Sequence, residues 1–203
     1  MAIKNLIFDC GGVLITRGRT PMEQTIGQMF SIPMEQAKKV WQESILDLLK
    51  GQRTSRQVIA SLRQKYHSPH DEQTLMRLWT EAWIIQHQEI NLDLLKYISL
   101  LKDQYALYIL TDTIDVYDEL IEINIYKNFN KIFRSWEQNV VKPDLQAFKN
   151  VLRQTNSQPE ETVLIDDVAS NVTAAEVTGM KGLVFTSTPQ LITDLAELGV
   201  EAK

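Results

Sequence analysis

Cysteine is almost absent from this sequence, since Cys10 is the only one among 203 residues. No internal disulfide is therefore possible, and a reducing compartment fits the chain. No apolar run approaches the ~18 residues that a membrane-spanning helix needs, and the N-terminus lacks the basic and apolar segments of a signal peptide. We therefore expect a cytoplasmic protein that has no membrane as a partner.

Runs of basic residues are also missing. Asp and Glu number 26 against 21 Lys and Arg, and the formal net charge is −5. This balance gives no electrostatic reason to expect nucleic acid as a partner. Hydrophobic residues make up 44% of the chain and charged residues 23%, as in ordinary globular proteins, and the length is enough to bury a substantial core.

Short apolar runs have the composition of β-strands, and helical patterns lie around and between the later ones. Strands that alternate with helices favour a parallel, doubly wound, Rossmann-like α/β sheet, and continuous apolar strands are typical of burial on both faces. The expected strands are residues 3–8, 105–110, 132–133, 163–165 and 183–185, and the expected helices lie near residues 92–101, 116–123, 145–152, 170–177 and 189–198.

Residues 17–88 interrupt this alternation. Pro33 suits the first turn of a helix, Gly51 ends the helical pattern that follows, and Thr54 and Ser55 can cap the next helix. Asp71 can open a further helix with one apolar face. We interpret the segment as a small helical bundle inserted between the first two strands, with a core that includes Trp41, Trp79 and Trp83.

Asp9 ends the first apolar run and precedes the turn Gly11-Gly12. An isolated Asp before glycines usually caps the turn, but ligands of open α/β sheets bind just outside the carboxyl ends of the strands. We expect three later segments to lie at the same edge of the sheet. Together the four segments offer a carboxylate nucleophile, a hydroxyl, an ammonium and an acidic pair, which suffice for metal-assisted phosphoryl transfer. The later segments carry Thr111, Lys142 and the pair Asp166-Asp167.

Thr111 and Lys142 each have an ordinary structural interpretation. Thr111 or Asp112 could simply cap a helix that starts near residues 112–114, although the same helix would direct its positive end at a phosphoryl oxygen. The lysine of an isolated Lys-Pro pair usually lies on the surface, in contact with solvent. Here Pro143 restricts the backbone of Lys142 before a helix, and this context favours an ammonium placed at the sheet edge.

The pair Asp166-Asp167 is the least ambiguous part of the pattern. It follows an apolar run directly, so both carboxylates emerge at one strand end. Two adjacent acids that face inward repel each other unless a cation lies beside them. Mg²⁺ prefers one or two carboxylates together with waters and substrate phosphate, and the pair therefore predicts a magnesium site.

The four segments together resemble the haloacid dehalogenase-like hydrolase superfamily, in the subfamily with a helical cap inserted after the first motif, and within it small bacterial sugar-phosphate phosphatases. The resemblance implies a Rossmann-like core of residues 1–16 and 89–203 and a helical cap of residues 17–88. It rests on the residues FDCGGVL at 8–14, on Thr111, on Lys142-Pro143-Asp144, and on Asp166-Asp167 with Asn171, Ala174, Ala175 and Gly179-Met180.

The resemblance also implies a role for each site residue. Asp9 is the nucleophile and forms an aspartyl-phosphate, while Lys142 neutralises Asp9 and the phosphate together. The substrate-binding residues are Thr111, Asp112, Lys142 and Gly12. The Mg²⁺ ligands are Asp9, the Gly11 carbonyl and Asp167, with Asp166 acting through water, and Asn171 orients the acidic pair.

Two positions depart from the family pattern. Phosphatases of the family usually carry a second Asp two residues after the nucleophile, where it acts as a general acid and base worth ~10²–10⁴ in rate. Gly11 occupies that position, and Asp112 stands where Asn is frequent. Asp112 is a candidate substitute for the proton donor. Arg17 or Arg19 could offset phosphate charge instead, although we favour an exposed linker for both arginines.

The function expected from these residues is Mg²⁺-dependent hydrolysis of small phosphomonoesters, with sugar phosphates as one class, so that the partner is a small phosphorylated metabolite. Weak turnover is one consequence that Gly11 could have. Two alternatives stay open. One is a turnover-impaired relative that binds phosphorylated ligands or a partner, and the other is a metal-independent dehalogenase, a class that lacks the adjacent acid pair.

Overall fold

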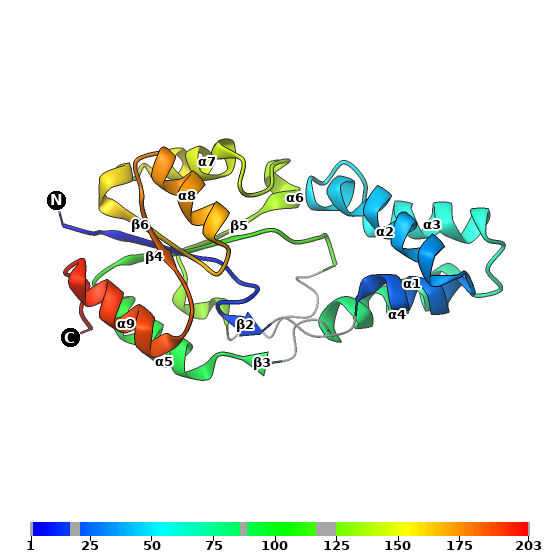
Figure 1. Cartoon of the computed structure of the whole chain (residues 1–203), viewed down its shortest axis with the longest axis horizontal. Helices are drawn as coiled ribbons and strands as arrows, with labels where there is room; N and C mark the ends of the chain where they lie inside the picture. The colour runs from blue at the N-terminus through cyan, green and yellow to red at the C-terminus, as the bar shows by residue number, and fades with distance from the viewer. Residues whose placement is uncertain (1, 17–20, 86–88, 117–124, 203) are drawn as a thin grey trace.

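Two groups of elements make up the computed structural model: a core built around a sheet and a separate bundle of helices (Figure 1). The structure describes residues 2–16, 21–85, 89–116 and 125–202. The bundle, called the helical lobe below, lies in the chain between β2 and β3. It comprises α1 (Met22–Phe30), α2 (Met34–Leu49), α3 (Ser55–Lys65) and α4 (Glu72–Ile85).

The core sheet is parallel and doubly wound, as the sequence predicts. Its strand order is β5-β4-β1-β6-β7, so the first strand in the chain lies at the centre. The carboxyl ends of the strands point toward the helical lobe, and both termini lie at the far end of the core (Figure 1). The strands are β1 (Asn5–Phe8), β4 (Ala106–Thr111), β5 (Lys131–Arg134), β6 (Thr162–Asp166) and β7 (Lys181–Val184).

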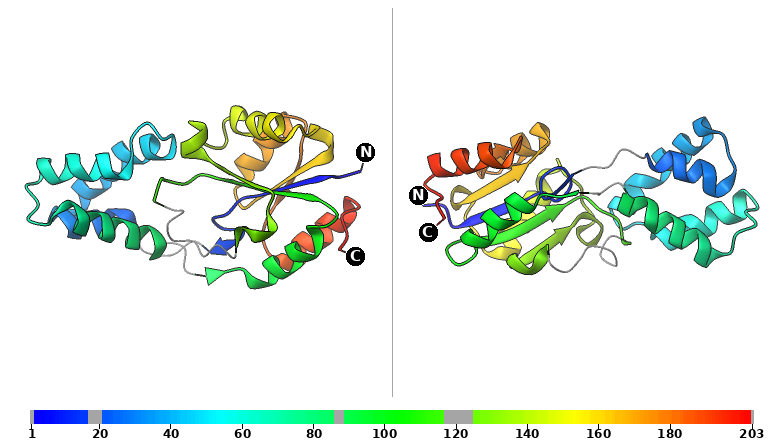
Figure 2. Two further views of the ribbon diagram at one scale, coloured as in Figure 1. Left: turned by 180° about the vertical axis from the view of Figure 1, so that it is seen from behind. Right: turned by 90° about the horizontal axis from the view of Figure 1, so that it is seen from below.

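Helices cover both faces of the sheet, because the strand side chains alternate between the faces. Leu6 and Phe8 of β1 pack in one apolar cluster with α5 (Leu92–Leu101) and α9 (Thr188–Glu197). Ile7 packs in the other cluster with α7 (Leu145–Thr155) and α8 (Ala169–Val177). The two helical layers are visible on opposite sides of the strands (Figure 2).

Three helices of the helical lobe begin where the sequence indicates. Pro33 precedes α2, and Thr54 caps α3 through a reciprocal pair of hydrogen bonds with Gln57. The Asp71 carboxylate accepts the Thr74 N–H at the start of α4. The ring of Trp41 lies 6.0 Å from the rings of both Trp79 and Trp83, and the two latter side chains are buried, which confirms the expected tryptophan core.

Several elements were not predicted. β2 (Ile15–Thr16) pairs antiparallel with β3 (Glu89–Ile90), and each strand is too short to carry a periodic signal. The short elements α6 (Ser135–Gln138), η1 (Tyr126–Asn128) and η2 (Pro159–Glu161) also went unpredicted. Of the expected helix at 116–123, only residue 116 lies within the described residues.

The helix expected to start at residues 112–114 is wrong, because these residues have no regular secondary structure. Their polar groups bond to other parts of the core. The Asp112 carboxylate accepts the Lys142 N–H, and the Thr113 N–H donates to Ser135 Oγ. These tertiary bonds hold the segment in a different path from the helix that its capping residues favour.

Among the residues that the structure describes, no helix is at once long enough and apolar enough to cross a bilayer.

Candidate active site

Three neighbouring strands of the sheet place polar side chains at one edge. Asp9 follows β1, and its backbone N–H donates to the Ile165 carbonyl of β6 at 2.8 Å. Thr111 is the last residue of β4 and Asp166 the last of β6. All three side chains are buried. The sheet register therefore brings together residues that lie more than fifty positions apart in the chain.

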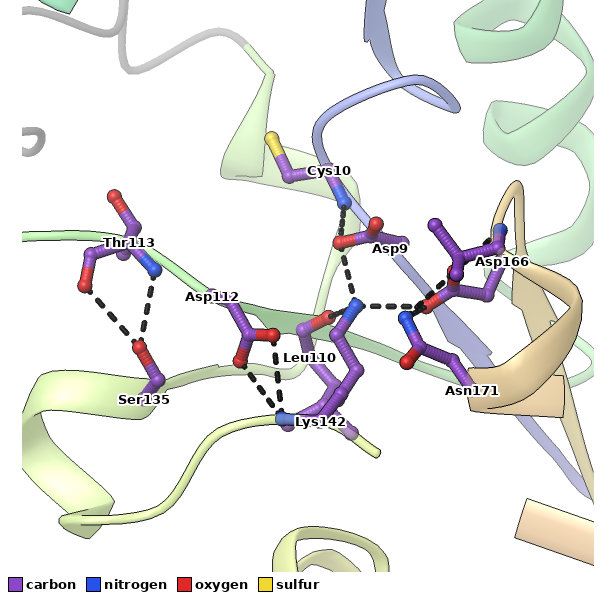
Figure 3. Close-up of polar contacts among 10 residues, drawn as sticks. Asp9, Cys10, Leu110, Asp112, Thr113, Ser135, Lys142, Asp166 and Asn171 are labelled. Carbon is purple, nitrogen blue, oxygen red and sulfur yellow. Dashed lines mark hydrogen bonds and ion pairs between the residues drawn. The ribbon is translucent and has the colours of Figure 1, made fainter. Parts of the chain in front are cut away.

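Lys142 lies at the centre of this group, in the loop that leads into α7. Its ammonium contacts Asp9 Oδ1 at 2.9 Å and Asp166 Oδ2 at 2.7 Å, and it donates to the Leu110 carbonyl at 3.2 Å (Figure 3). The side chain is only 2% exposed. Three acceptors match the three N–H donors of the ammonium, so its position is fixed.

Asp166 is held on both carboxylate oxygens. Oδ1 accepts the Val168 N–H at 2.9 Å and the Asn171 amide at 3.0 Å, while Oδ2 accepts the same amide at 3.1 Å in addition to Lys142. Asn171 thus orients Asp166, which is the first member of the acidic pair (Figure 3). Among the hydrogen bonds that the structure describes, Asn171 donates to Asp166 and not to Asp167.

Gly12 lies directly against the second member of the pair. A Cβ added at Gly12 would lie 2.2 Å from Asp167 Oδ2, and the φ of Gly12 is +92°. Only glycine combines this backbone conformation with this close approach. The turn after β1 therefore leaves room for the Asp167 carboxylate beside Asp9.

The carboxylates of Asp9, Asp166 and Asp167 form one cluster, in which each offers an oxygen within 4.8 Å of the others. Mg²⁺ bonds to oxygen at 2.0–2.1 Å, so ligands on opposite sides of the ion lie ~4.2 Å apart. Three carboxylates beside one ammonium also leave negative charge for a cation to offset. The residues present therefore fit a magnesium ion in spacing, chemistry and charge.

The buried charges shift each other's pKa values. Burial, reinforced by the charge of Asp166, raises the pKa of the Asp9 carboxyl to about 6, although Lys142 acts in the opposite direction. Burial alone would lower the pKa of the Lys142 ammonium, but the carboxylates of Asp9, Asp166 and Asp112 outweigh it and raise that pKa above its ordinary value. Lys142 is thus cationic at neutral pH.

Asp112 is turned toward the backbone of the Lys142 loop. Both carboxylate oxygens lie 3.2 Å from the Lys142 backbone nitrogen, whose N–H they accept (Figure 3). A carboxylate placed this way supports the loop that carries the ammonium. Gly11 is half-buried and bridges to Ile15, and Arg17 and Arg19, the other residues considered for the missing acid, lie outside the described residues.

Apart from the Gly11 carbonyl, the sequence did not predict the backbone groups of the site or the contacts just beyond it. The Cys10 N–H donates to Asp9 Oδ1 at 2.7 Å, and the Leu110 carbonyl accepts from Lys142. These two backbone groups carry no residue signature, so only the fold reveals them. Cys10 itself is buried. Asp115, which bonds to Ser55 of the helical lobe, was not singled out either.

Comparison with known families gives a match along most of the chain. Residues 6–185 match the model of the family described as haloacid dehalogenase-like hydrolase. A D-ribitol-5-phosphate phosphatase of Bacteroides thetaiotaomicron is 24% identical over 181 residues, which cover 84% of this chain and 85% of that protein. A sesquiterpene phosphatase of Aspergillus oryzae is 37% identical over 70 residues, and the match spans only 36% of that protein.

Solved structures share the fold. A predicted HAD-like family hydrolase of Porphyromonas gingivalis superposes with a TM-score of 0.80 at 23% identity and covers 99% of this chain and 100% of that one. A HAD family enzyme of Bacteroides thetaiotaomicron, solved in complex with magnesium and inorganic phosphate, gives 0.77 at 24% identity over 94% of this chain and 99% of that one. A 2-haloacid dehalogenase of Pseudomonas syringae gives 0.64 at 16% identity and covers 89% and 85%.

Proposed function

Since this chain belongs to the haloacid dehalogenase-like hydrolase family, we propose that it is a Mg²⁺-dependent phosphatase of small phosphomonoesters that reacts through Asp9. The observation that carries the proposal is the cluster at the sheet edge. Asp9 lies 2.9 Å from the Lys142 ammonium and shares a carboxylate cluster with Asp166 and Asp167. Phosphoryl transfer needs a nucleophilic carboxylate, a fixed ammonium beside it and a site for a metal cation.

In the proposed metal site, Asp9, Asp167 and the Gly11 carbonyl bind Mg²⁺ directly and Asp166 binds through water. The close approach of Gly12 to Asp167 supports this assignment, because it keeps the Asp167 carboxylate next to the turn that carries Asp9. When bound, the ion supplies Lewis-acid polarisation of a phosphoryl oxygen.

The chain's own residues perform the transfer in two steps. A carboxylate oxygen of Asp9 bonds to phosphorus while the bond from phosphorus to the ester oxygen breaks, which leaves an aspartyl-phosphate and an ester oxygen that takes up a proton to become an alcohol. A water then attacks this phosphorus, and the bond to Asp9 breaks to release inorganic phosphate and the free carboxylate. Lys142 offsets negative charge in both steps, while the Thr111 hydroxyl and the following N–H hold a phosphoryl oxygen.

The leaving oxygen needs a proton, and Gly11 offers no side chain to supply it. The Asp112 carboxylate accepts the Lys142 N–H, so this carboxylate is better suited to support the loop than to donate a proton. Three outcomes follow from the residues. Another group supplies the proton, the natural substrate has a good leaving group, or turnover is slow.

The helical lobe, within residues 17–88, is the proposed cap that selects the substrate and excludes bulk water at the carboxyl ends of the strands. The substrate class is a small phosphorylated metabolite such as a sugar or polyol phosphate. The relative named as a D-ribitol-5-phosphate phosphatase supports this class, since its match extends along most of both chains. A cytoplasmic location stays an expectation from the sequence.

Gly11 favours a second candidate, a protein that binds phosphorylated ligands and has lost efficient turnover. The dehalogenase alternative is disfavoured, because the three clustered carboxylates suit a cation and would repel a carboxylate substrate.

The test is a screen of phosphomonoesters with purified protein, with Mg²⁺ and after chelation. We expect phosphate release that requires Mg²⁺ and falls at least 10³-fold in Asp9→Asn, a substitution that keeps the shape of the side chain but removes the nucleophile. Tight binding of phosphorylated ligands without phosphate release would support the binding protein instead. Release of halide from 2-haloacids without metal would establish the dehalogenase and overturn the proposal.

A further inference from the structure

A carboxylate of the core caps a helix of the helical lobe. The Ser55 N–H donates to Asp115 Oδ1 and Oδ2 at 3.0 and 3.1 Å, and the Ser55 hydroxyl also donates to Oδ1. Ser55 is the first residue of α3 and is fully buried, while Asp115 is half-buried in the core segment that follows β4. We call this pair the Ser55–Asp115 contact.

The contact is favourable for two physical reasons. The N–H groups at the start of a helix have no partners inside the helix, and the helix dipole places positive charge there. Hydrogen bonds to an ionised carboxylate are stronger than neutral ones, and this carboxylate receives both the N–H and the hydroxyl of Ser55. Thr54 caps the Gln57 N–H of α3 independently, so the Asp115 bonds are additional to the helix's own cap.

Asp115 belongs to the segment that builds the candidate active site. It lies four residues after Thr111, and the intervening residues are tied to other loops of the core. Asp112 accepts the N–H of Lys142, and Thr113 exchanges hydrogen bonds with Ser135. These bonds tie the segment that carries Asp115 to the core, and one of them also supports the backbone of Lys142.

A second close approach lies at the same end of the helical lobe. A Cβ added at Gly51, between α2 and α3, would lie 2.1 Å from the Trp136 carbonyl of α6, and the φ of Gly51 is +63°. The ends of α2 and α6 lie next to each other in the ribbon as well (Figures 1 and 2). The turn from α2 to α3 thus packs against the core at Gly51, in addition to the Ser55–Asp115 contact.

We propose that Asp115 is a positioning residue for the reaction: it holds the amino end of α3, and with it the helical lobe, against the carboxyl edge of the sheet. The catalytic consequence rests on the proposed phosphatase function, whereas the effect on the lobe does not. Loss of the contact lowers the population of molecules in which the helical lobe lies against the sheet edge, and apparent substrate affinity falls by the same factor.

Three substitutions test the role of Asp115. Asp115→Ala removes the carboxylate, and Asp115→Asn keeps one acceptor oxygen and serves as the conservative variant. Ser55→Pro removes both donors from the other side. The first helical position accepts proline, and Thr54 already has the extended backbone that precedes proline, with φ −86° and ψ 156°. The matched control is Asp71→Ala, which removes a carboxylate that caps α4 within the lobe.

The first measurement is the distance between the helical lobe and the core. Spin labels at Lys39→Cys on α2 and Lys149→Cys on α7 occupy exposed positions, and the native Cys10 is buried. We expect a longer and broader distance distribution in Asp115→Ala and Ser55→Pro, a smaller change in Asp115→Asn, and the wild-type distribution in Asp71→Ala. Wild-type distributions in both Asp115→Ala and Ser55→Pro would overturn the proposal.

The second measurement separates KM from kcat with p-nitrophenyl phosphate and Mg²⁺. We expect KM to rise about tenfold in Asp115→Ala and Ser55→Pro while kcat changes less than about threefold. A fall in kcat at constant KM would contradict the positioning role. If the wild-type protein hydrolyses no phosphomonoester, the proposed function fails, and the spin-label distances still decide whether Asp115 holds the helical lobe.

Discussion

At the scale of single residues, Gly11 and Gly12, which follow Asp9 closely, have different roles. Gly11 has no positive φ, so its backbone accepts other residues, whereas Gly12 has a φ of +92° and lies against Asp167. Gly11 leaves the proposed reaction without an acid next to the nucleophile. Gly12 provides the space that the acidic cluster occupies.

Gly11→Asp is expected to speed hydrolysis of phosphomonoesters with poor leaving groups, by about tenfold or more, because it adds a proton donor two residues after the nucleophile. The measurement is kcat/KM across a series of alkyl and aryl phosphates. Gly11→Asn has the same size without the acid and is the control. A folded Gly11→Asp variant that gains nothing on alkyl phosphates would contradict this account of the missing acid.

Gly12→Ala is expected to weaken Mg²⁺ binding at least tenfold, because its Cβ would lie 2.2 Å from Asp167 Oδ2 and push this carboxylate away. Gly199 is a matched control, since its φ is +77° and an added Cβ meets nothing within 4 Å. Gly199→Ala therefore shares the backbone strain alone. Calorimetric titration with Mg²⁺ distinguishes the two variants, and equal affinities would show that Asp167 adapts or does not bind the ion.

At the scale of elements, the sequence predicts what has a repeating pattern. The helix expected near residues 92–101 is α5 (Leu92–Leu101), and the continuous apolar runs became the central strands. β2 and β3 have two residues each and no period to detect. The prediction of a helix that starts near residues 112–114 was wrong, because bonds from Asp112 and Thr113 to distant loops replaced the local capping that it assumed.

The same distinction, between features that have a sequence pattern and features that have none, applies to the candidate site. Asp9, Thr111, Lys142 and Asp166 could be chosen in advance because each stands at the end of an apolar run or before a proline-led helix. The Ser55–Asp115 contact could not, since no pattern in the sequence pairs these two residues. The sequence shows that Ser55 can begin a helix, but only the packing of the helical lobe on the core shows which carboxylate meets it.

α7 begins three residues after Lys142, and its cap offers a test of what positions the ammonium. The Asp144 carboxylate accepts the Gln146 N–H at 2.9 Å, so Asp144→Ala is expected to cost about 1 kcal/mol of unfolding free energy, measured with urea. We expect kcat to change less than about twofold, because Lys142 is held by two buried ion pairs and by Asp112. A tenfold loss of kcat would mean that the first turn of α7 positions the lysine.

At the scale of the whole molecule, the acidic cluster joins the central strand β1 to its neighbour β6. Burial of like charges there is unfavourable for the metal-free fold. The pKa of Asp9 is about 6 in the folded chain and about 3.9 in an unfolded one. Between these values the folded state holds more protons, so this group makes the metal-free protein less stable as the pH rises from about 4 to 6.

Magnesium is expected to reverse this loss, because it binds the folded state and requires the ionised carboxylate. At a concentration 100 times its Kd the ion adds about 2.7 kcal/mol to the unfolding free energy, which for 203 residues corresponds to a Tm rise of about 5–10 °C. The rise should be full above pH 7 and should decline as the pH falls through about 6, where protons compete for Asp9.

Thermal unfolding at pH 5 and pH 7.5, with and without Mg²⁺, measures this coupling, and Asp167→Asn controls for ion effects elsewhere on the molecule. If the variant gains as much Tm as the wild type at pH 7.5, the ion that stabilises the fold does not bind at this cluster. An equal gain at the two pH values in the wild type would instead show that Asp9 is not a ligand, because a ligand whose pKa is about 6 must make binding weaker at pH 5.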